Sequence, residues 1–221
     1  QYFNPTLLWV PIRENQTNDN YANSMIYSGF KIEKDKYQLW MEFLLDDYQI
    51  DKHIKEPTTF ALTLGAFVDN FKKFNFWIEY TRVANRTYQT YGEFGEENYL
   101  HRGVPVGHYL GNDFDNLIFK FKWKNHKILD YKISPSLTAS FMRDGNNGLD
   151  TDWDSPWIDQ DNEFLESFEE PFPTTPVNKL VHSELNAKVA FNDETYIDIG
   201  LAYKDNLSSL DNDKVFEIYF R

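Results

Sequence analysis

The chain has 221 residues and a formal net charge of −13, and 18% of its residues are aromatic although its mean hydropathy is −0.62. The acidic balance disfavours nucleic acid as a partner, because that requires clustered lysine and arginine, and the absence of cysteine excludes disulfides and thiolate metal sites. No run approaches the roughly 18 consecutive apolar residues of a membrane-spanning helix, so a role within a membrane would require a β-barrel.

Apolar and polar residues alternate with a period of two along most of the chain, which predicts β-strands. The opening segment Tyr2–Ile12 is apolar but has no clean phase. The strands that follow are expected at residues 26–32, 37–45, 59–68, 74–81, 117–123, 129–141, 185–191, 197–203 and 214–221. We expect about ten strands, most of them about 10–14 residues long, whereas strands of globular proteins usually have about five or six residues and membrane-crossing strands about 9–11.

The predicted connections alternate between short and long. Very short turns are expected at Lys34–Lys36, Asn70–Lys72, Asn125–Lys127 and Asn192–Glu194. Longer segments are expected at Arg13–Tyr21, Asp46–Pro57, Asn85–Asp113, Asp144–Asn178 and Asp205–Asp213. Because an up-and-down meander places alternate connections at opposite ends of a sheet, one end carries the tight turns and the other carries the long loops. Outer-membrane barrels have this asymmetry.

Strand length and this asymmetry favour an all-β fold, an antiparallel up-and-down transmembrane β-barrel, over a soluble β-sandwich or lectin-like jelly roll, whose strands also alternate. Parity places both termini at the periplasmic end, and the last strand finishes in the aromatic run Phe216–Phe220. Pro135 lacks a donor for the ladder, so a bulge or a local break is expected there. The candidates for aromatic girdles at the membrane interfaces are Trp40, Tyr80, Trp123 and Tyr203.

The loop over residues 85–113 is dense in groups suited to sugar recognition. Aromatic faces stack on pyranose rings, while arginine and carboxylate side chains hold hydroxyls or acidic sugar groups. The candidate polysaccharide-binding residues are Arg82, Arg86, Tyr88, Tyr91, Tyr99, His101, Arg102, His108 and Asp113. The alternative is a loop folded into the barrel mouth, whose glycines and prolines serve only to make turns.

Two motifs in this region resemble a known family. Residues 79–82 read Glu-Tyr-Thr-Arg, and residues 98–111 read Asn-Tyr-Leu-His-Arg-Gly-Val-Pro-Val-Gly-His-Tyr-Leu-Gly. These runs resemble the strand and loop motifs of the Wzi-type capsule assembly proteins, in which an acidic residue, here Asp113, precedes the next strand. The resemblance in motif covers residues 79–117.

The resemblance implies an outer-membrane barrel of about eighteen strands, an even number as in other bacterial barrels. Such a barrel binds or anchors capsular polysaccharide or exopolysaccharide at the Gram-negative cell surface and is not an enzyme. It also implies a small periplasmic helical portion ahead of the barrel. Residues 1–221 would then be one β-barrel domain, the C-terminal part of such a protein, with external loops at 85–113 and 144–178. A self-contained ten-stranded barrel is the other possibility.

The expected partners are surface polysaccharide, outer-membrane lipid, lipopolysaccharide and further outer-membrane chains, with no nucleic acid. The face opposite the apolar one would line the barrel lumen. Its candidate luminal residues are Trp77, Glu79, Lys120 and Lys122. Charges of mixed sign there usually pair, but they would also suit a porin or transporter-like channel, which is an alternative function. A second alternative is a soluble lectin or glycosidase, the latter requiring two carboxylates about 5–10 Å apart.

The loop over residues 144–178 contains three aspartates that begin like a calcium loop: Asp150, Asp152 and Asp154. An EF-hand requires Gly at the sixth position and Glu at the twelfth, where this chain has Ser155 and Asp161. We therefore expect no cofactor, with Ca²⁺ as the minor alternative to a solvated acidic loop. The seven-residue separation of His101 and His108 is no recognised ligand spacing, and no phosphate-binding, dinucleotide or nucleophile motif is present.

Overall fold

The structure is a computed structural model of the chain. It describes residues 25–47, 57–89, 100–101, 104–105, 107–124, 126–128, 131–149, 151, 156, 158, 169–191, 195–208 and 214–220. The apolar segment at residues 2–12 lies outside this set. No helix among the described residues is long and apolar enough to cross a membrane.

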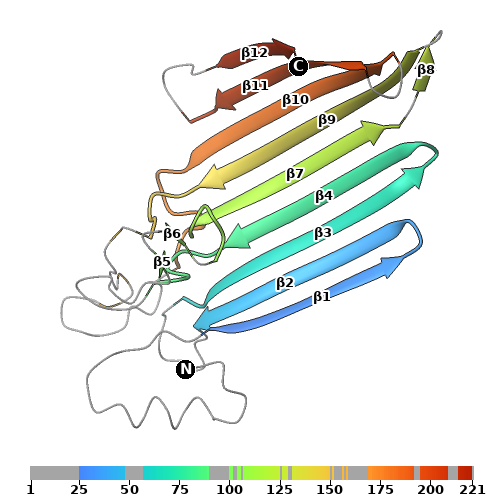
Figure 1. The fold of residues 1–221 in the computed structure, drawn as a ribbon. Coiled ribbons are helices and arrows are strands. Elements are labelled where there is room, and N and C mark those ends of the chain that lie inside the picture. The colour runs from blue at the N-terminus through green and yellow to red at the C-terminus, as the bar shows by residue number, and fades with distance from the viewer. Residues whose placement is uncertain are drawn as a thin grey trace.

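One antiparallel sheet dominates the described residues, and nine of its strands follow one another as an up-and-down meander (Figure 1). These nine strands are β1 (Ile26–Lys34), β2 (Tyr37–Asp47), β3 (Thr59–Phe71), β4 (Phe74–Val83), β7 (Phe114–Trp123), β9 (Tyr131–Asp144), β10 (Asn178–Ala190), β11 (Tyr196–Asn206) and β12 (Val215–Phe220). A tenth strand, β8 (His126–Ile128), pairs only with β9, and β5 (Leu100–His101) forms a separate hairpin with β6 (Val104–Pro105). The predicted all-β antiparallel meander is confirmed.

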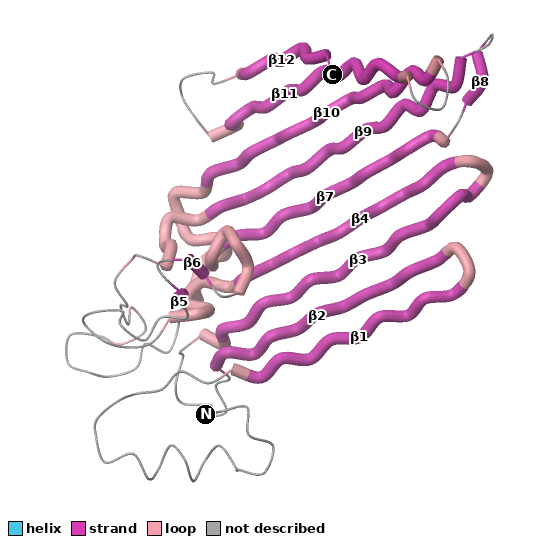
Figure 2. Tube along the Cα trace, viewed as in Figure 1, coloured by secondary structure: helices cyan, strands magenta, loops and turns pink. Residues whose placement is uncertain are grey.

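The predicted asymmetry of the connections is also confirmed. The tight hairpins β1–β2, β3–β4 and β10–β11 lie at one end of the sheet, and the long connections lie at the other, as the tube view also shows (Figure 2). The β3–β4 turn places Lys72 and Lys73 at φ 50° and 74°, the left-handed values that a type I′ hairpin turn requires at both central positions.

Two strands begin earlier than predicted, because polar residues hide their alternation. β10 starts at Asn178 rather than Leu185, and β7 starts at Phe114 rather than Leu117. The first residues of β10 include a lysine, a histidine and a glutamate, but they pair with β9 without interruption from Asn178 to Ala190. These residues therefore form a strand because they pair with β9, although their sequence does not alternate clearly between apolar and polar residues.

The region around Pro135 shows the expected local break. β7 pairs with β9 as far as Lys122 opposite Ser136, and pairing resumes in a shifted register with His126 of β8 opposite Ile133. On its other side β9 pairs with β10 through Pro135 itself, opposite Ala187. The short turn expected at residues 125–127 is wrong, because residues 126–128 form β8, which pairs with β9.

The registers bring the apolar positions of all nine strands onto one face of the sheet. Ile78 lies opposite Phe119, and Leu185 lies between Leu137 and Leu201. This apolar face is exposed on every strand; its exposed members include Ile26, Phe30, Ile32, Leu39, Leu64, Ile78, Leu117, Phe141, Leu185, Ile199, Leu201, Ile218 and Phe220. Within the described strands, every Asp, Glu, Lys or Arg on this face lies among the first or last two residues of its strand.

The opposite, polar face carries most of the serine, threonine, asparagine and charged residues, and the buried core lies on this side. Val83, Tyr88, Phe114 and Leu149 form one cluster at the long-loop end. Trp40 was expected in an interfacial girdle, but it lies on the polar face, because its neighbours Leu39 and Met41 occupy the apolar one. Tyr80, Trp123 and Tyr203 lie on the apolar face, as expected of girdle residues.

Candidate functional site

Four of the predicted polysaccharide-binding residues gather where the long loops fold over the polar face. These four are Arg86, Tyr88, His108 and Asp113. Three of them are almost fully covered, with 3% of Arg86, 2% of Tyr88 and 1% of Asp113 exposed.

Their polar groups are bound within the protein. The Arg86 guanidinium forms an ion pair with Glu170, and the Tyr88 backbone N–H donates to the Asp46 carboxylate over 2.6 Å. The Asp113 carboxylate accepts from the Thr174 backbone N–H over 3.0 Å and from the Thr174 hydroxyl. These contacts join the end of β2 to three loop segments that are distant in the sequence, so Arg86, Tyr88 and Asp113 hold the loop end together.

Burial also sets the protonation of this cluster. Desolvation raises the pKa of the Asp113 carboxyl, against the lowering effect of its hydrogen bonds from Thr174 and Asn147. Burial lowers the pKa of His108 and raises that of Tyr88. The neutral His108 ring packs on Phe114 at 4.6 Å between centroids, and its Nδ1 accepts the Leu110 backbone N–H over 3.2 Å.

The remaining candidates of the loop region are placed differently. Arg82 stacks its guanidinium on the Phe172 ring at 3.7 Å, on the apolar face. His101 is described only as part of the β5–β6 hairpin, opposite Val104. Tyr91, Tyr99 and Arg102 lie outside the described residues, as do the calcium candidates Asp150, Asp152 and Asp154.

A pocket of about 440 Å³ opens on the polar face of β1, β2 and β4, away from the loops. Two indoles form its floor, with the Trp40 and Trp77 ring centroids 4.5 Å apart. Trp40 lies across Gly65 of β3, where an added Cβ would come within 2.0 Å of the indole ring. Only glycine leaves room for the ring at this position.

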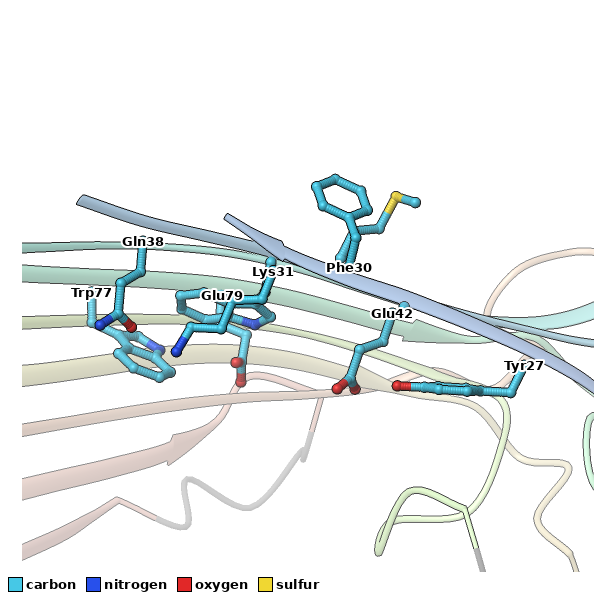
Figure 3. A pocket seen from close by; sticks show the side chains of 10 residues that line it. Tyr27, Phe30, Lys31, Gln38, Glu42, Trp77 and Glu79 are labelled. Carbon is cyan, nitrogen blue, oxygen red and sulfur yellow. The ribbon is translucent and has the colours of Figure 1, made fainter. Parts of the chain in front are cut away.

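Polar groups surround these two indoles. Figure 3 shows Lys31, Gln38, Glu42 and Glu79 on the same side of the sheet as Trp77, whereas Phe30 points to the other side. The Lys120 ammonium lies 5.5 Å from the centre of the Trp77 ring. The Trp77 indole nitrogen is buried and has no hydrogen-bond partner among the described residues.

A second hollow of about 330 Å³ continues from the pocket towards the loops. It shares Tyr27 and Glu42 with the pocket and extends past Thr63 and Thr81 to Tyr88 and His108. The two hollows together make a polar, aromatic-floored track along the sheet, from the β1–β2 side to the loop-end cluster.

The predicted luminal residues Trp77, Glu79, Lys120 and Lys122 all share the polar face. Trp77 pairs with Lys120, and Glu79 lies two positions further along β4. Lys122 lies apart from the pocket, near the tight turns. The sequence reasoning did not assign Trp40, Gln38 and Glu42 to a site, although Trp40 and Trp77 each lie opposite a β3 residue, Gly65 and Phe67, on one face.

The described residues include no group of three or more His, Cys, Asp or Glu side chains that could hold a metal ion. The arrangement that they do form is a neutral aromatic floor with donors and acceptors at its rim, which suits binding of a hydroxyl-rich ligand. Comparison of the chain with protein-family models, with curated proteins and with solved structures found no match in any of the three.

Proposed function

We propose that this chain forms part of the wall of a transmembrane β-barrel in the outer membrane of a Gram-negative bacterium, and that its polar face binds a surface polysaccharide without chemically altering it. The membrane placement rests on the exposed apolar face, on which the charged residues of the described strands lie only at strand ends. A soluble sheet with such a face would expose it to water over nine strands, which soluble proteins avoid.

The dimensions of the apolar face fit a bilayer. On β9 it extends from Tyr131 to Phe141, ten steps of about 3.4 Å, or about 34 Å along the strand. A tilt of about 35–45° reduces this to about 24–28 Å of height, close to the band of about 25 Å on outer-membrane barrels. Aromatic residues lie at the turn end, where Phe74 packs on Trp123 and Tyr131 on Phe191, as interfacial girdles do.

The direction of the edge strands limits how many strands the proposed barrel can have. β1 and β12 are the first and ninth members of an alternating series, so they run the same way. Joining them directly would create a parallel pair, whereas an antiparallel barrel needs an even number of strands. An odd number of further strands, outside the described residues, would complete the proposed wall: one would give the ten-stranded barrel and nine the eighteen-stranded one.

Polysaccharide is the ligand that the polar face suits best. Indole faces stack on the C–H faces of pyranose rings, and the rim of Gln38, Glu42 and Lys31 can exchange hydrogen bonds with hydroxyls. The elongated track favours a polymer over a single small solute. The motif at residues 98–111, which resembles the Wzi-type loop, gives independent support for a capsule-related ligand.

Titration of the full chain in detergent micelles with a purified uronic-acid-containing polysaccharide tests this proposal. We expect Trp40→Ala and Trp77→Ala to weaken binding about tenfold, because each removes a stacking platform, and Trp123→Ala, on the apolar face, to leave it unchanged. Equal affinities for all three variants would contradict the site. If changes at Tyr99, His101 or Arg102 weaken binding instead, the loop motif rather than the pocket binds the polymer.

A further inference from the structure

One row of charged side chains crosses the apolar face at its long-loop end. The registers align Arg82 with Asp115, Asp115 with Arg143, and Arg143 with Lys179, on the neighbouring strands β4, β7, β9 and β10. Three of these four residues are cationic, although the whole chain carries a net charge of −13. The row therefore carries a net positive charge in an acidic chain.

The single acid in the row holds one cation in place and is itself covered. The Arg143 Nε donates to Asp115 Oδ1 over 2.9 Å, and its Nη2 pairs with Oδ2. The Tyr80 hydroxyl also donates to Asp115 Oδ2, over 3.3 Å. The Arg143 side chain is 37% exposed, against 7% for Asp115, so the surface presents the guanidinium and not the carboxylate.

The other two cations are held differently. Arg82 is fixed by stacking on Phe172, and its Nε is buried and has no hydrogen-bond partner among the described residues. Lys179 is exposed and forms no ion pair within the described part of the chain. Asp205, diagonally across from Lys179 on β11, is 8% exposed and accepts the Tyr203 hydroxyl over 2.6 Å.

The row lies at the boundary of the apolar band. One step nearer the middle of the sheet come Tyr80, Leu117, Phe141 and Val181, all uncharged. Two of these four residues are aromatic, so from the middle towards the loops the face changes from apolar residues, through a partly aromatic level, to the charged row. This order matches a bilayer leaflet, from acyl chains through the interface to the phosphate groups.

We propose that Arg82, Arg143 and Lys179 form a docking surface for the phosphate groups of a phosphorylated lipid in the outer leaflet. Guanidinium groups bind phosphate oxygens in pairs, and an ammonium adds a mobile point charge. The assignment of lipid phosphate as the ligand of this row rests on charge complementarity and on the position of the row at the edge of the apolar band. It also rests on the proposed barrel, because only membrane insertion brings head groups to this height.

The test uses the full chain, reconstituted in phosphatidylcholine nanodiscs that contain either lipid A with both phosphates or its enzymatically dephosphorylated form. Native mass spectrometry then measures the lipid retained after transfer to detergent. We expect preferential retention of the phosphorylated lipid. Lys179→Gln should reduce this retention about fivefold, and the double variant Arg143→Gln/Lys179→Gln further. The matched control, Lys122→Gln on the polar face, should retain the lipid like the unaltered chain.

Two outcomes would overturn the inference, and they differ in what else they overturn. If the chain inserts but retains both lipids equally, or if Lys179→Gln behaves like Lys122→Gln, the row does not bind phosphate and the barrel proposal stands. If the chain does not enter the bilayer, the inference and the membrane placement fail together. Lys179→Gln changes one exposed side chain and breaks no ion pair, so its result does not depend on the integrity of the Arg143–Asp115 contact.

Discussion

The two faces of this sheet are built from alternate residues of the same strands, yet they have opposite relations to their surroundings. The apolar face has large exposed side chains on all nine strands, although Phe172 packs on Arg82 at its loop end. The polar face carries the buried cluster of Val83, Tyr88, Phe114 and Leu149, with loops folded over it. A soluble domain has the reverse arrangement, with its apolar face covered and its polar face in water.

This difference between the faces bears on what removes the apolar side chains from water. Few side chains in the described structure are fully buried, and those lie at one end of the polar face. Among the described residues, few apolar side chains are buried for a sheet of this size, although folding depends mainly on burial of apolar area. A lipid environment around the apolar face would remove it from water without a second protein layer.

The largest effect is expected where the polar face is fully covered. Phe114 is 0% exposed within the loop-end cluster, so Phe114→Ala should lower the free energy of unfolding by about 3–5 kcal/mol. Denaturant titration of the folded chain measures this loss. Ile118→Ala, further along the same face of β7 and only partly covered, should cost less. Equal losses would mean that the loop end is no better packed than the open part of the face.

A charge on the apolar face should have the next largest effect. Leu137 lies at mid-sheet between Phe121 and Leu185, so Leu137→Arg would place a guanidinium among acyl chains and should cost about 2–4 kcal/mol. Thr138→Arg, one residue along β9 on the polar face, should change stability by less than about 1 kcal/mol. Reversible unfolding from lipid vesicles gives both values. Similar costs for the two variants would show that the faces do not differ in environment.

The smallest expected effect is a pH dependence of the loop end. Because burial lowers the pKa of His108, the folded state binds a proton there less readily than the unfolded state does. Stability from this group is complete above the ordinary value of about 6.5 and is lost as the pH falls from there towards the lowered folded pKa. The raised pKa of Asp113 acts in the opposite sense, so the change should be modest.

Hydrogen exchange of the Leu110 amide, corrected for the intrinsic pH dependence of exchange, measures this change, since that amide donates to His108 Nδ1. Its protection should fall as the pH decreases. His108→Asn is the matched control, because an amide oxygen can accept the same hydrogen bond and does not titrate. An equally pH-dependent protection in this variant would assign the effect to another group.

The sheet could be predicted from the sequence because period-two alternation records directly which face each residue occupies. The beginning of β10 could not be predicted in this way, because Lys179 and Ser183 lie on its apolar face and Leu180 on its polar face, against the alternation. The candidate site was less predictable. Arg86, Tyr88 and Asp113 have partners in other loops, 84 residues away in the case of Arg86 and Glu170, and no local pattern reveals that they are buried. Trp40 was misplaced because an aromatic residue near a turn fits either face.

Lipid contact along a single strand tests the central claim most directly. The chain has no cysteine, so single cysteines at positions 136–141 of β9 can each carry one environment-sensitive fluorophore in the reconstituted protein. The proposed barrel predicts quenching by nitroxide-labelled acyl chains at 137, 139 and 141, and little quenching at 136, 138 and 140. Uniform quenching, or access of aqueous iodide to both sets, would contradict a membrane wall with its apolar face in lipid.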